Sequence, residues 1–463
     1  MIALSLARIA AATDGRVVGD PETVVSGPVV VDSRQAGPGG LFVAVLGEHV
    51  DGHDFADQAG ARGAVAVLGS RATALPGVVV EDPVVALGRL GRVVRDALAG
   101  TTVVALTGSQ GKTGTKDYLA QVLAEQGPTV ATAGNLNNEL GVPLTLLRAE
   151  AGTEHLVLEM GARGVGHIGY LCGFARPQVA AVLNVGTAHL GEFGSRAAIA
   201  AAKGEIVEGL PADGVAVLNA DDPLTAAMAR RTDAAVLTFG ESGEVGWREV
   251  AVDALGRPSF RLVTPDGSWP VRLRLSGGHQ VANAAAAAAL ALAAGVPADR
   301  VAPALSRAVP ASRWRMELHE RGDGTVVVND SYNANPASVA AALESLASLG
   351  ARRRARTLAV LGEMRELGEE SEAAHREIGI LAARLGIDVL VAVGQAGDPI
   401  ARGMEEALAE GRGDATVVRT AGREEATAWL GHHVVAGDVV LVKASRGVAL
   451  EHVADALIGE TER

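Results

Sequence analysis

Residues 102–125 read TVVALTGSQGKTGTKDYLAQVLAE, in which a β-branched strand runs into a glycine-rich turn and then into a helical segment. Backbone N–H groups of such a turn, together with the helix N-terminus behind it, can bind phosphate. The usual spacing G-x-x-x-x-G-K-[ST] would place a glycine at position 106, where this chain has leucine, so the loop is a shorter variant. We predict a nucleotide-phosphate site rather than a chance glycine-rich turn, with the hydroxyl at position 113 as a Mg²⁺ ligand. Its residues are Gly108, Ser109, Gln110, Gly111, Lys112, Thr113 and Gly114.

Strands and helices alternate on both sides of this stretch, which predicts an α/β fold. Short valine-rich runs before residue 99 predict a small α/β domain, and those after residue 100 predict a mostly parallel sheet covered on both faces. Pro303 and Pro310 indicate a hinge, beyond which another alternating series predicts a doubly wound domain. At about 150 residues per domain, 463 residues fit three domains. We predict a small N-terminal α/β domain at 1–99, a central P-loop ATPase-like domain at 100–312 and a C-terminal Rossmann-like domain at 313–463.

Charge and apolar content restrict the partners of this chain. It has 41 basic and 54 acidic residues and a formal net charge of −13, which disfavours binding to nucleic acid or to anionic membranes. The longest apolar run, 284–294, is too short to span a bilayer, and the start lacks the pattern of a signal peptide. The single cysteine, Cys172, fits a reducing compartment. We expect a cytoplasmic protein that binds small molecules at local sites.

Lysine is rare in this chain, because 37 of the 41 basic residues are arginine. A guanidinium cannot replace a primary amine that must react. Each remaining lysine is therefore a candidate functional residue, although four leftover lysines could also fall anywhere. They are Lys112, Lys116, Lys203 and Lys443.

Further polar residues follow the phosphate loop. The segment GNLNNELGVP at 134–143 is rich in amides, which could cap turns or bind a ligand. Glu159 and His189 follow predicted strands, and open α/β sheets bind ligands at the carboxyl ends of their strands. Together with Lys203 they are candidate metal-site residues, whereas each alone is compatible with an ordinary polar position.

These segments and several others resemble the Mur ligases, the ATP-dependent ligases of peptidoglycan synthesis, over essentially the whole chain. In the first hundred residues the resemblance rests on DSR at 32–34, GLFVA at 40–44 and DGHDF at 51–55. In the central part it rests on the phosphate loop, the amide-rich segment, EMGA at 159–162, HLGEFG at 189–194, AK at 202–203 and NADDP at 219–223. In the last part it rests on RME at 315–317, DSYNANP at 330–336, GEMRELG at 362–368 and KASRG at 443–447.

The resemblance implies ATP and two Mg²⁺ ions as cofactors. Lys112, Glu159, His189 and Lys203 would be the catalytic residues. Thr113 and Glu159 would hold one ion. His189 would hold the second ion with Lys203, which this family carbamylates with CO₂, a modification that needs a primary amine. The residues implied to contact ATP outside the phosphate loop are Asn219, Asn283, Arg315 and Asp330.

The same resemblance implies which residues bind the other substrates, with the uridine diphosphate end held by the first domain. His49 and Gln280 depart from the arginine and asparagine that the family often has at these positions. Asn335 and Pro336 also have a local interpretation, as the N-cap and first residue of a helix. The implied substrate-binding residues are Ser33, Arg34, Asp51, His53, Asn135, Asn137, Asn138, Tyr332, Asn333, Lys443, Ser445 and Arg446.

Within the family, the segment DSYNANP favours the enzyme that joins D-alanyl-D-alanine to UDP-N-acetylmuramoyl-tripeptide through an acyl phosphate. We also expect the chain to be a monomer. A ligase that adds the third peptide residue characteristically has Asp-Asn-Pro-Arg, which this chain lacks. A folate polyglutamate-type ligase would not explain the first domain. From another class, a P-loop kinase or NTP hydrolase would leave Lys203 and the third domain unexplained. A catalytically inactive nucleotide-binding protein is disfavoured because the expected phosphate and metal ligands are all present in the sequence.

Overall fold

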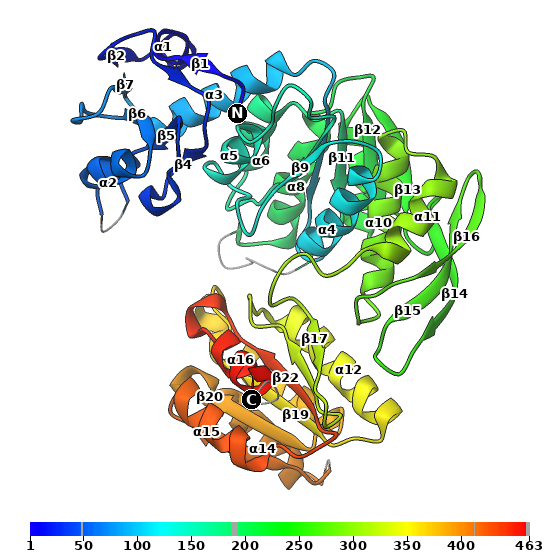
Figure 1. The fold of residues 1–463 in the computed structure, drawn as a ribbon. Coiled ribbons are helices and arrows are strands. Elements are labelled where there is room, and N and C mark those ends of the chain that lie inside the picture. Colours follow the sequence, from blue (N-terminus) through cyan, green and yellow to red (C-terminus); the bar gives the residue numbers. More distant parts are fainter. Residues whose placement is uncertain (48–49, 187–192, 412, 460–463) are drawn as a thin grey trace. The chain divides into compact units, whose positions relative to one another are not determined.

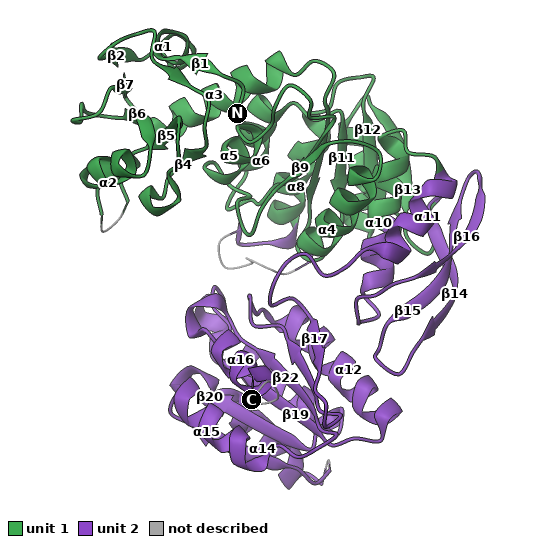
Figure 2. Cartoon of the chain, in the orientation of Figure 1, with its two compact units in different colours: residues 1–185, 197–243, 286–297 green, residues 186–196, 244–285, 298–463 purple. Residues whose placement is uncertain are grey.

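The computed structural model describes residues 1–47, 50–186, 193–411 and 413–459 (Figure 1). The chain divides into two compact units (Figure 2). The predicted domain boundaries near residues 99 and 312 are not the boundaries of these units and stay predictions. The first unit comprises residues 1–185, 197–243 and 286–297, and the second comprises residues 186–196, 244–285 and 298–463.

The N-terminal part of the first unit is built on a five-stranded sheet in the order β2-β7-β6-β5-β4. β2 and β7 are antiparallel, and the other neighbours are parallel. Phe42 of β5 and Val67 of β6 share an apolar cluster with Ala59 of α2, so the valine-rich runs form the core of this part. The elements are β1 (Leu4–Ser5), α1 (Leu6–Thr13), β2 (Arg16–Val18), β3 (Val24–Val25), β4 (Val29–Val30), β5 (Gly40–Val43), α2 (Ala56–Ala61), β6 (Ala64–Gly69), β7 (Gly77–Val79) and α3 (Pro83–Ala97).

The central sheet of the first unit has six parallel strands in the order β13-β12-β11-β8-β10-β9. The predicted strand at 102–106 and helix at 112–125 are present as β8 and α4. Residues 103–106 of β8 are fully buried, as expected for an inner strand with both faces covered. The elements are β8 (Thr102–Thr107), α4 (Lys112–Ala124), β9 (Thr129–Ala131), α5 (Gly141–Leu146), β10 (His155–Glu159), α6 (His167–Ala175), β11 (Val179–Val182), α8 (Arg196–Glu208), β12 (Val215–Asn219), α9 (Pro223–Ala226) and β13 (Ala235–Phe239).

A small antiparallel sheet, β14-β15-β16, follows in the second unit, and none of its strands was expected. β15 alternates buried and partly exposed positions, the period-2 pattern that could have revealed it. Two helices follow this sheet in the sequence. The elements are β14 (Gly246–Val252), β15 (Pro258–Thr264), β16 (Gly267–Arg272), α10 (Gln280–Ala293) and α11 (Ala298–Arg307).

Pro303 lies inside α11, so the prediction of a hinge at this proline is wrong. A proline within a helix removes one backbone donor. In α11 the neighbouring residues Val301, Ala302, Ala304 and Leu305 are buried. The apolar burial of this face stabilises the helix despite the missing hydrogen bond.

The last sheet has the order β17-β18-β22-β19-β20-β21, with only the β17–β18 pair antiparallel. Ala359 and Leu361 of β19 pack in one apolar cluster with α12, α13 and α14. Leu358 and Val360 pack in a second cluster with α15 and α16, so helices cover both faces. The elements are β17 (Glu317–Glu320), β18 (Val326–Asn329), α12 (Pro336–Arg353), β19 (Thr357–Leu361), α13 (Ser371–Arg384), β20 (Val389–Val393), α14 (Asp398–Ala409), β21 (Thr416–Thr420), α15 (Arg423–His433), β22 (Val439–Lys443) and α16 (Glu451–Gly459).

None of the helices in the described ranges combines the length and the apolar content that a membrane span needs. The helix start expected at Asn335 and Pro336 is confirmed. Asn335 is the N-cap of α12, its side chain accepts from the Ser338 N–H, and the Ser338 hydroxyl accepts from the Asn335 N–H. This reciprocal pair is a capping box, which fixes the first turn of the helix.

Candidate active site

The phosphate loop lies between β8 and α4, at the carboxyl end of a strand inside the central sheet. Gly111 has a φ of 77°, a left-handed conformation that favours glycine, and α4 begins at the next residue. A Cβ on Gly108 would lie 2.9 Å from the Cβ of Leu183, so this glycine allows a close approach to the end of β11. The Lys112 ammonium donates to Gly108 O at 2.6 Å. The N-terminus of a 13-residue helix therefore follows the loop directly, an arrangement that can bind phosphate.

Asn184, two residues after β11, holds this loop in place. The Ser109 N–H donates to Asn184 O at 3.1 Å, and the Gln110 N–H donates to Asn184 Oδ1 at 2.9 Å. The Asn184 amide returns a hydrogen bond to Gln110 O at 3.2 Å. The sequence interpretation missed Asn184 as a site residue. Its position directly after an apolar strand is the signal that could have identified it.

Glu159 ends β10 and is 2% exposed. Its two carboxylate oxygens accept from the Thr113 hydroxyl and from the Asn137 amide, each at 2.9 Å. Both donors are neutral, and no ion pair of Glu159 is found in the parts of the chain that the structure describes. A buried carboxylate is costly unless a cation or further hydrogen bonds compensate its charge. The structure thus brings together the predicted residues Thr113, Asn137 and Glu159 around a carboxylate suited to bind a cation.

Lys116 is connected to the backbone of Glu159 through Thr132. It is 4% exposed, it forms an ion pair with Asp117 Oδ1 at 2.6 Å, and it donates to Thr132 O at 3.0 Å. The Thr132 hydroxyl in turn accepts from the Glu159 N–H at 3.0 Å. One threonine after β9 therefore connects the helix of the phosphate loop with the backbone of Glu159.

Lys203 lies in α8 and is 6% exposed. Burial, and next the positive charge of Lys112, lower the pKa of the Lys203 ammonium to about 7. Across the described residues, its ammonium makes no hydrogen bond or ion pair. A lysine in this environment is neutral in a substantial fraction of molecules near pH 7, and a neutral amine is a nucleophile.

The position of α8 is fixed by Arg231. Its guanidinium donates to Ala200 O at 3.0 Å and to Ala201 O at 2.8 Å, in the turn before Lys203. A Cβ on Gly204 would collide with this guanidinium, so the glycine makes room for it. Neither Gly204 nor Arg231 was predicted to have this role, because their contact joins residues 27 positions apart in different elements.

The residues around Glu159 fit Mg²⁺. This ion prefers oxygen ligands and is usually bound through one or two carboxylates together with substrate phosphates and water. The Thr113 hydroxyl and the Glu159 carboxylate offer such oxygens directly beside the phosphate loop. No group of three or more His, Cys, Asp or Glu side chains that could hold a metal by itself occurs in the described ranges. An ion at Glu159 would therefore need phosphate oxygens to complete its coordination.

Other predicted ATP contacts have internal partners. The Asn219 amide, at the end of β12, donates to Leu183 O at 2.8 Å, and its oxygen accepts from the Asp221 N–H at 2.9 Å. Asn219 thus joins the ends of two neighbouring strands. Asn283, in the second unit, donates to Gln280 Oε1 at 3.2 Å. The departure at Gln280 therefore provides the partner of Asn283.

In the N-terminal part, the predicted residues form two local clusters. The Ser33 hydroxyl donates to Gln58 Oε1 at 2.5 Å, and the Arg34 guanidinium pairs with Asp32 while remaining 77% exposed. His53 is buried, and its Nδ1 lies 2.5 Å from Asp51 Oδ1.

The ring of His53 is held as a neutral tautomer. Its Nε2 accepts from the Ser70 N–H at 2.9 Å, so the proton lies on Nδ1 and is donated to Asp51. This hydrogen bond is the main cause that lowers the pKa of the Asp51 carboxyl. The guanidinium of Arg71 bonds the second oxygen of Asp51 at 3.1 Å. Both ring nitrogens of His53 are thus used within the chain, whereas the exposed guanidinium of Arg34 points to solvent.

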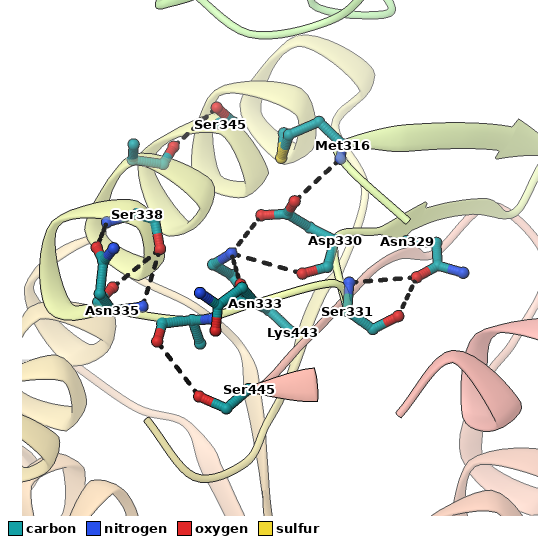
Figure 3. A network of polar contacts seen from close by, with 12 residues as sticks. Met316, Asn329, Asp330, Ser331, Asn333, Asn335, Ser338, Ser345, Lys443 and Ser445 are labelled. Atoms are coloured by element: carbon teal, nitrogen blue, oxygen red, sulfur yellow. Dashed lines mark hydrogen bonds and ion pairs between the residues drawn. The ribbon is translucent and has the colours of Figure 1, made fainter. Parts of the chain in front are cut away.

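Four predicted residues of the third domain, Asp330, Asn333, Lys443 and Ser445, belong to a network of polar contacts in the second unit (Figure 3). Other predicted residues make ring contacts. The Arg315 guanidinium lies 4.1 Å from the centroid of the Tyr332 ring. Arg446 lies 4.4 Å from the centroid of the Trp314 ring and pairs with the buried Glu451. The Ser445 hydroxyl accepts from the Arg365 N–H at 2.9 Å, which connects KASRG with GEMRELG.

Of the remaining predicted residues, two asparagines have local hydrogen-bond partners, one asparagine is exposed and two histidines lie outside the described residues. Asn138 Oδ1 accepts from the Gly141 N–H at 3.0 Å, which supports the cap interpretation for this amide. Asn135 is exposed. Asn333 Oδ1 accepts from the Ala334 N–H at 2.9 Å. His189 and His49 lie outside the described residues.

A phosphate loop on a parallel sheet, with a buried carboxylate beside it, defines a nucleotide-phosphate-binding α/β protein that uses a divalent cation. Three family models match the chain: "Mur ligase family, catalytic domain" at residues 28–97, "Mur ligase middle domain" at 106–291 and "Mur ligase, glutamate ligase domain" at 314–446. The chain belongs to the Mur ligase family, which confirms the resemblance and the three-domain α/β fold expected from the sequence.

Individual relatives are similar over nearly the full length. The chain is 45% identical to the UDP-N-acetylmuramoyl-tripeptide–D-alanyl-D-alanine ligase of Mycobacterium tuberculosis, over 99% of this chain and 98% of that one. It is 38% identical to the Escherichia coli protein of the same name, over 99% of each. Among solved structures, MurF from Acinetobacter baumannii has a TM-score of 0.87 at 34% identity, with 99% of each chain covered. MurF ligase from Thermotoga maritima in complex with ADP has a TM-score of 0.80 at 32% identity, with 95% of this chain and 98% of that one covered.

Proposed function

We propose that this chain joins D-alanyl-D-alanine to UDP-N-acetylmuramoyl-tripeptide and converts ATP to ADP and phosphate in the same reaction. The observation that carries the proposal is the buried Glu159 carboxylate, which has only neutral partners in the described chain and lies beside the phosphate loop. The full-length relatives named for this reaction supply the substrates, and the ADP in the Thermotoga maritima relative supports ATP as the phosphate donor.

The first step transfers the γ-phosphoryl group of ATP to the terminal carboxylate of the tripeptide. A carboxylate oxygen forms a bond to the γ-phosphorus while the bond to the β,γ-bridging oxygen breaks, which gives an acyl phosphate and ADP. The loop residues 108–113 and the Lys112 ammonium orient the phosphates, and alignment with charge neutralisation provides most of the catalysis. Mg²⁺, when bound by Thr113 and Glu159, would neutralise charge on the phosphate oxygens.

The second step forms the amide bond. The free amine of D-alanyl-D-alanine attacks the acyl carbon, a proton is lost from nitrogen, and phosphate leaves as the tetrahedral intermediate collapses. Arg315, Tyr332 and Arg446 of the second unit, with positive charge and an aromatic face, are the side chains that we assign to the anionic ends of the substrates.

Lys203 is proposed to carry a carbamate that supports a second Mg²⁺ with His189. The neutral amine attacks the carbon of CO₂ and loses a proton, which leaves an anionic carbamate. The supporting observations are the burial of Lys203, its pKa lowered to about 7 and the lack of a partner for its ammonium in the described chain. Arginine offers no such amine at this pH.

We further propose that the chain works in the cytoplasm as a monomer on small molecules. The lone buried Cys172 is consistent with a reducing compartment. Light scattering of the purified chain tests the monomer, and a dimer mass at micromolar concentration would contradict it.

Phosphate release tests the reaction itself. We expect turnover only when ATP, UDP-N-acetylmuramoyl-tripeptide and D-alanyl-D-alanine are all present, and loss of turnover in Lys112→Met. Full-rate release with ATP alone would instead indicate an NTP hydrolase. Release that requires a free diamino acid and a UDP-muramoyl dipeptide would indicate the ligase that adds the third residue.

A further inference from the structure

Lys443, the last residue of β22, is 2% exposed and has all its neighbours within the second unit (Figure 3). Its ammonium forms an ion pair with Asp330 Oδ2 at 2.6 Å and donates to Asn333 O at 2.8 Å. Asp330 O lies 3.5 Å away as a third, longer acceptor. An ammonium has three donors, so the chain itself supplies an acceptor for each of them.

The carboxylate of Asp330 also contacts a second segment of the chain, the turn that contains Met316. Its other oxygen, Oδ1, accepts from the Met316 N–H at 3.1 Å. The carboxylate therefore joins the end of β22 to the turn at 313–316, which lies before β17. Figure 3 shows Asp330 between Lys443 and Met316. Without the ammonium, the partly buried carboxylate would lose its counter-charge and would be drawn toward water.

The turn that Asp330 holds has an uncommon backbone. Trp314 has a φ of 60° and Met316 a φ of 49°, a left-handed region that bulky residues rarely adopt. Such a conformation persists only when its surroundings maintain it. Three hydrogen bonds in the described chain do so here: the Met316 N–H donates to Asp330 Oδ1, the Tyr332 N–H donates to Trp314 O at 3.1 Å, and the Trp314 N–H donates to Glu317 Oε2 at 3.0 Å. Arg315 lies between these two positions and stacks on the Tyr332 ring.

We infer that Lys443 is a positioning residue: it neutralises Asp330, whose carboxylate holds the Met316 N–H and thereby sets the turn that presents Arg315. This inference rests on the proposed function in so far as Arg315 serves ATP. In this inference Lys443 does not contact substrate directly, as the resemblance implied, but acts through Asp330. It also explains why lysine occupies this position, since two acceptors at 2.6 and 2.8 Å around one buried atom suit a compact ammonium better than a planar guanidinium.

Lys443→Met in two backgrounds separates positioning from direct contact. We expect kcat/KM for ATP to fall about 100-fold in the natural background, mainly through KM, because the charged Asp330 releases the Met316 N–H. In the Asp330→Asn background we expect a further loss of less than about 5-fold, since a neutral amide oxygen still accepts from Met316 and needs no counter-charge. Equal losses in both backgrounds would mean that Lys443 binds substrate directly and would overturn the inference.

Arg356→Met is the matched control. Arg356 pairs with Asp438, which is 2% exposed and directly precedes β22 at the opposite end of that strand. Breaking this pair should lower the Tm while leaving KM for ATP within about 3-fold. An equal rise of KM in the control would overturn the inference, because general destabilisation would then explain the effect. Where Lys443→Met alone does not fold, the double variant is compared with Asp330→Asn by itself: a loss below about 5-fold supports the inference, and a loss near 100-fold would overturn it.

Hydrogen exchange of the Met316 amide provides a readout that needs no ligation. We expect faster exchange in Lys443→Met and near-normal exchange in the double variant. Unchanged exchange in Lys443→Met would overturn the inference even where the ligase assay succeeds. A chain that fails to ligate but shows the expected exchange would contradict the proposed function alone.

Discussion

Two helices of the first unit each carry a buried lysine, and the two lysines have opposite surroundings. Lys116 in α4 is 4% exposed and has the Asp117 carboxylate and Thr132 O as partners. Lys203 in α8 is 6% exposed, has no partner in the described chain, and is subject to the positive charge of the Lys112 ammonium. Burial alone therefore does not define what a lysine does. A partnered ammonium connects elements, whereas an unpartnered one loses its proton and becomes available for chemistry.

The largest expected effect is the loss of activity when Lys203 is replaced, which tests whether this lysine reacts chemically or only connects elements. Lys203→Arg should reduce kcat at least about 1,000-fold, because a guanidinium stays protonated and cannot form a carbamate. Lys203→Ala should be equally inactive and should regain part of its rate with short carboxylic acids, measured by phosphate release. Full activity of Lys203→Arg would remove the carbamate from the proposed mechanism, and circular dichroism checks that the variants are folded.

The next effect concerns stability at Lys116. Lys116→Met leaves the Asp117 carboxylate buried without its counter-charge, and we expect a loss of about 3–5 kcal/mol in the free energy of unfolding. Urea unfolding measures this loss. The double variant with Asp117→Asn should recover most of it, since no buried charge is left. A double variant as unstable as Lys116→Met would show that the ion pair is not what holds this region.

The effect that is smallest for each pH unit is a pH dependence of stability that comes from Lys203. Its pKa is lowered from 10.5 to about 7 on folding, so the unfolded chain binds the extra proton between these values. Stability should therefore rise with pH from about 7 to about 10.5, by no more than about 1.4 kcal/mol per pH unit for this group. Below pH 7 the full cost of burying the charge is present.

Urea unfolding in CO₂-free buffer, with Lys203→Met as the reference, isolates this contribution. The difference in unfolding free energy between the two proteins should change with pH in this window. A difference that stays constant from pH 7 to pH 10 would contradict the lowered pKa.

Local patterns were enough to predict the phosphate loop and the helix start at Asn335. In both cases the structure depends on residues within a few positions of each other. Gly111 has the left-handed conformation directly before α4, and Asn335 forms hydrogen bonds with Ser338. The hinge predicted at Pro303 was wrong because the helix α11 around it is stabilised by packing of its buried apolar side chains. The local sequence shows the proline but not what these side chains pack against.

Contacts between distant residues could not be predicted in this way. The hydrogen bonds between Asn184 and the phosphate loop span 74 or 75 positions, and the Lys443–Asn333 contact spans 110. The resemblance implied that Lys443 and Asp330 are site residues, yet only the structure showed that the two form an ion pair with each other. Sequence reasoning thus named Glu159 and Lys203 as candidate site residues, and these roles stay predictions, whereas it missed the supporting contacts of Asn184 and Arg231.

Cys172 has a practical consequence. It lies buried in α6, and burial raises the pKa of its thiol to about 12. The thiolate is the nucleophile that adds to a maleimide, so at neutral pH the natural chain is nearly inert to such reagents. A cysteine placed at exposed Asp213 in the first unit and another at exposed Glu369 in the second would therefore be labelled selectively. Fluorophores attached there would follow the separation of the two units as substrates are added, in a protein that needs no prior removal of its own cysteine.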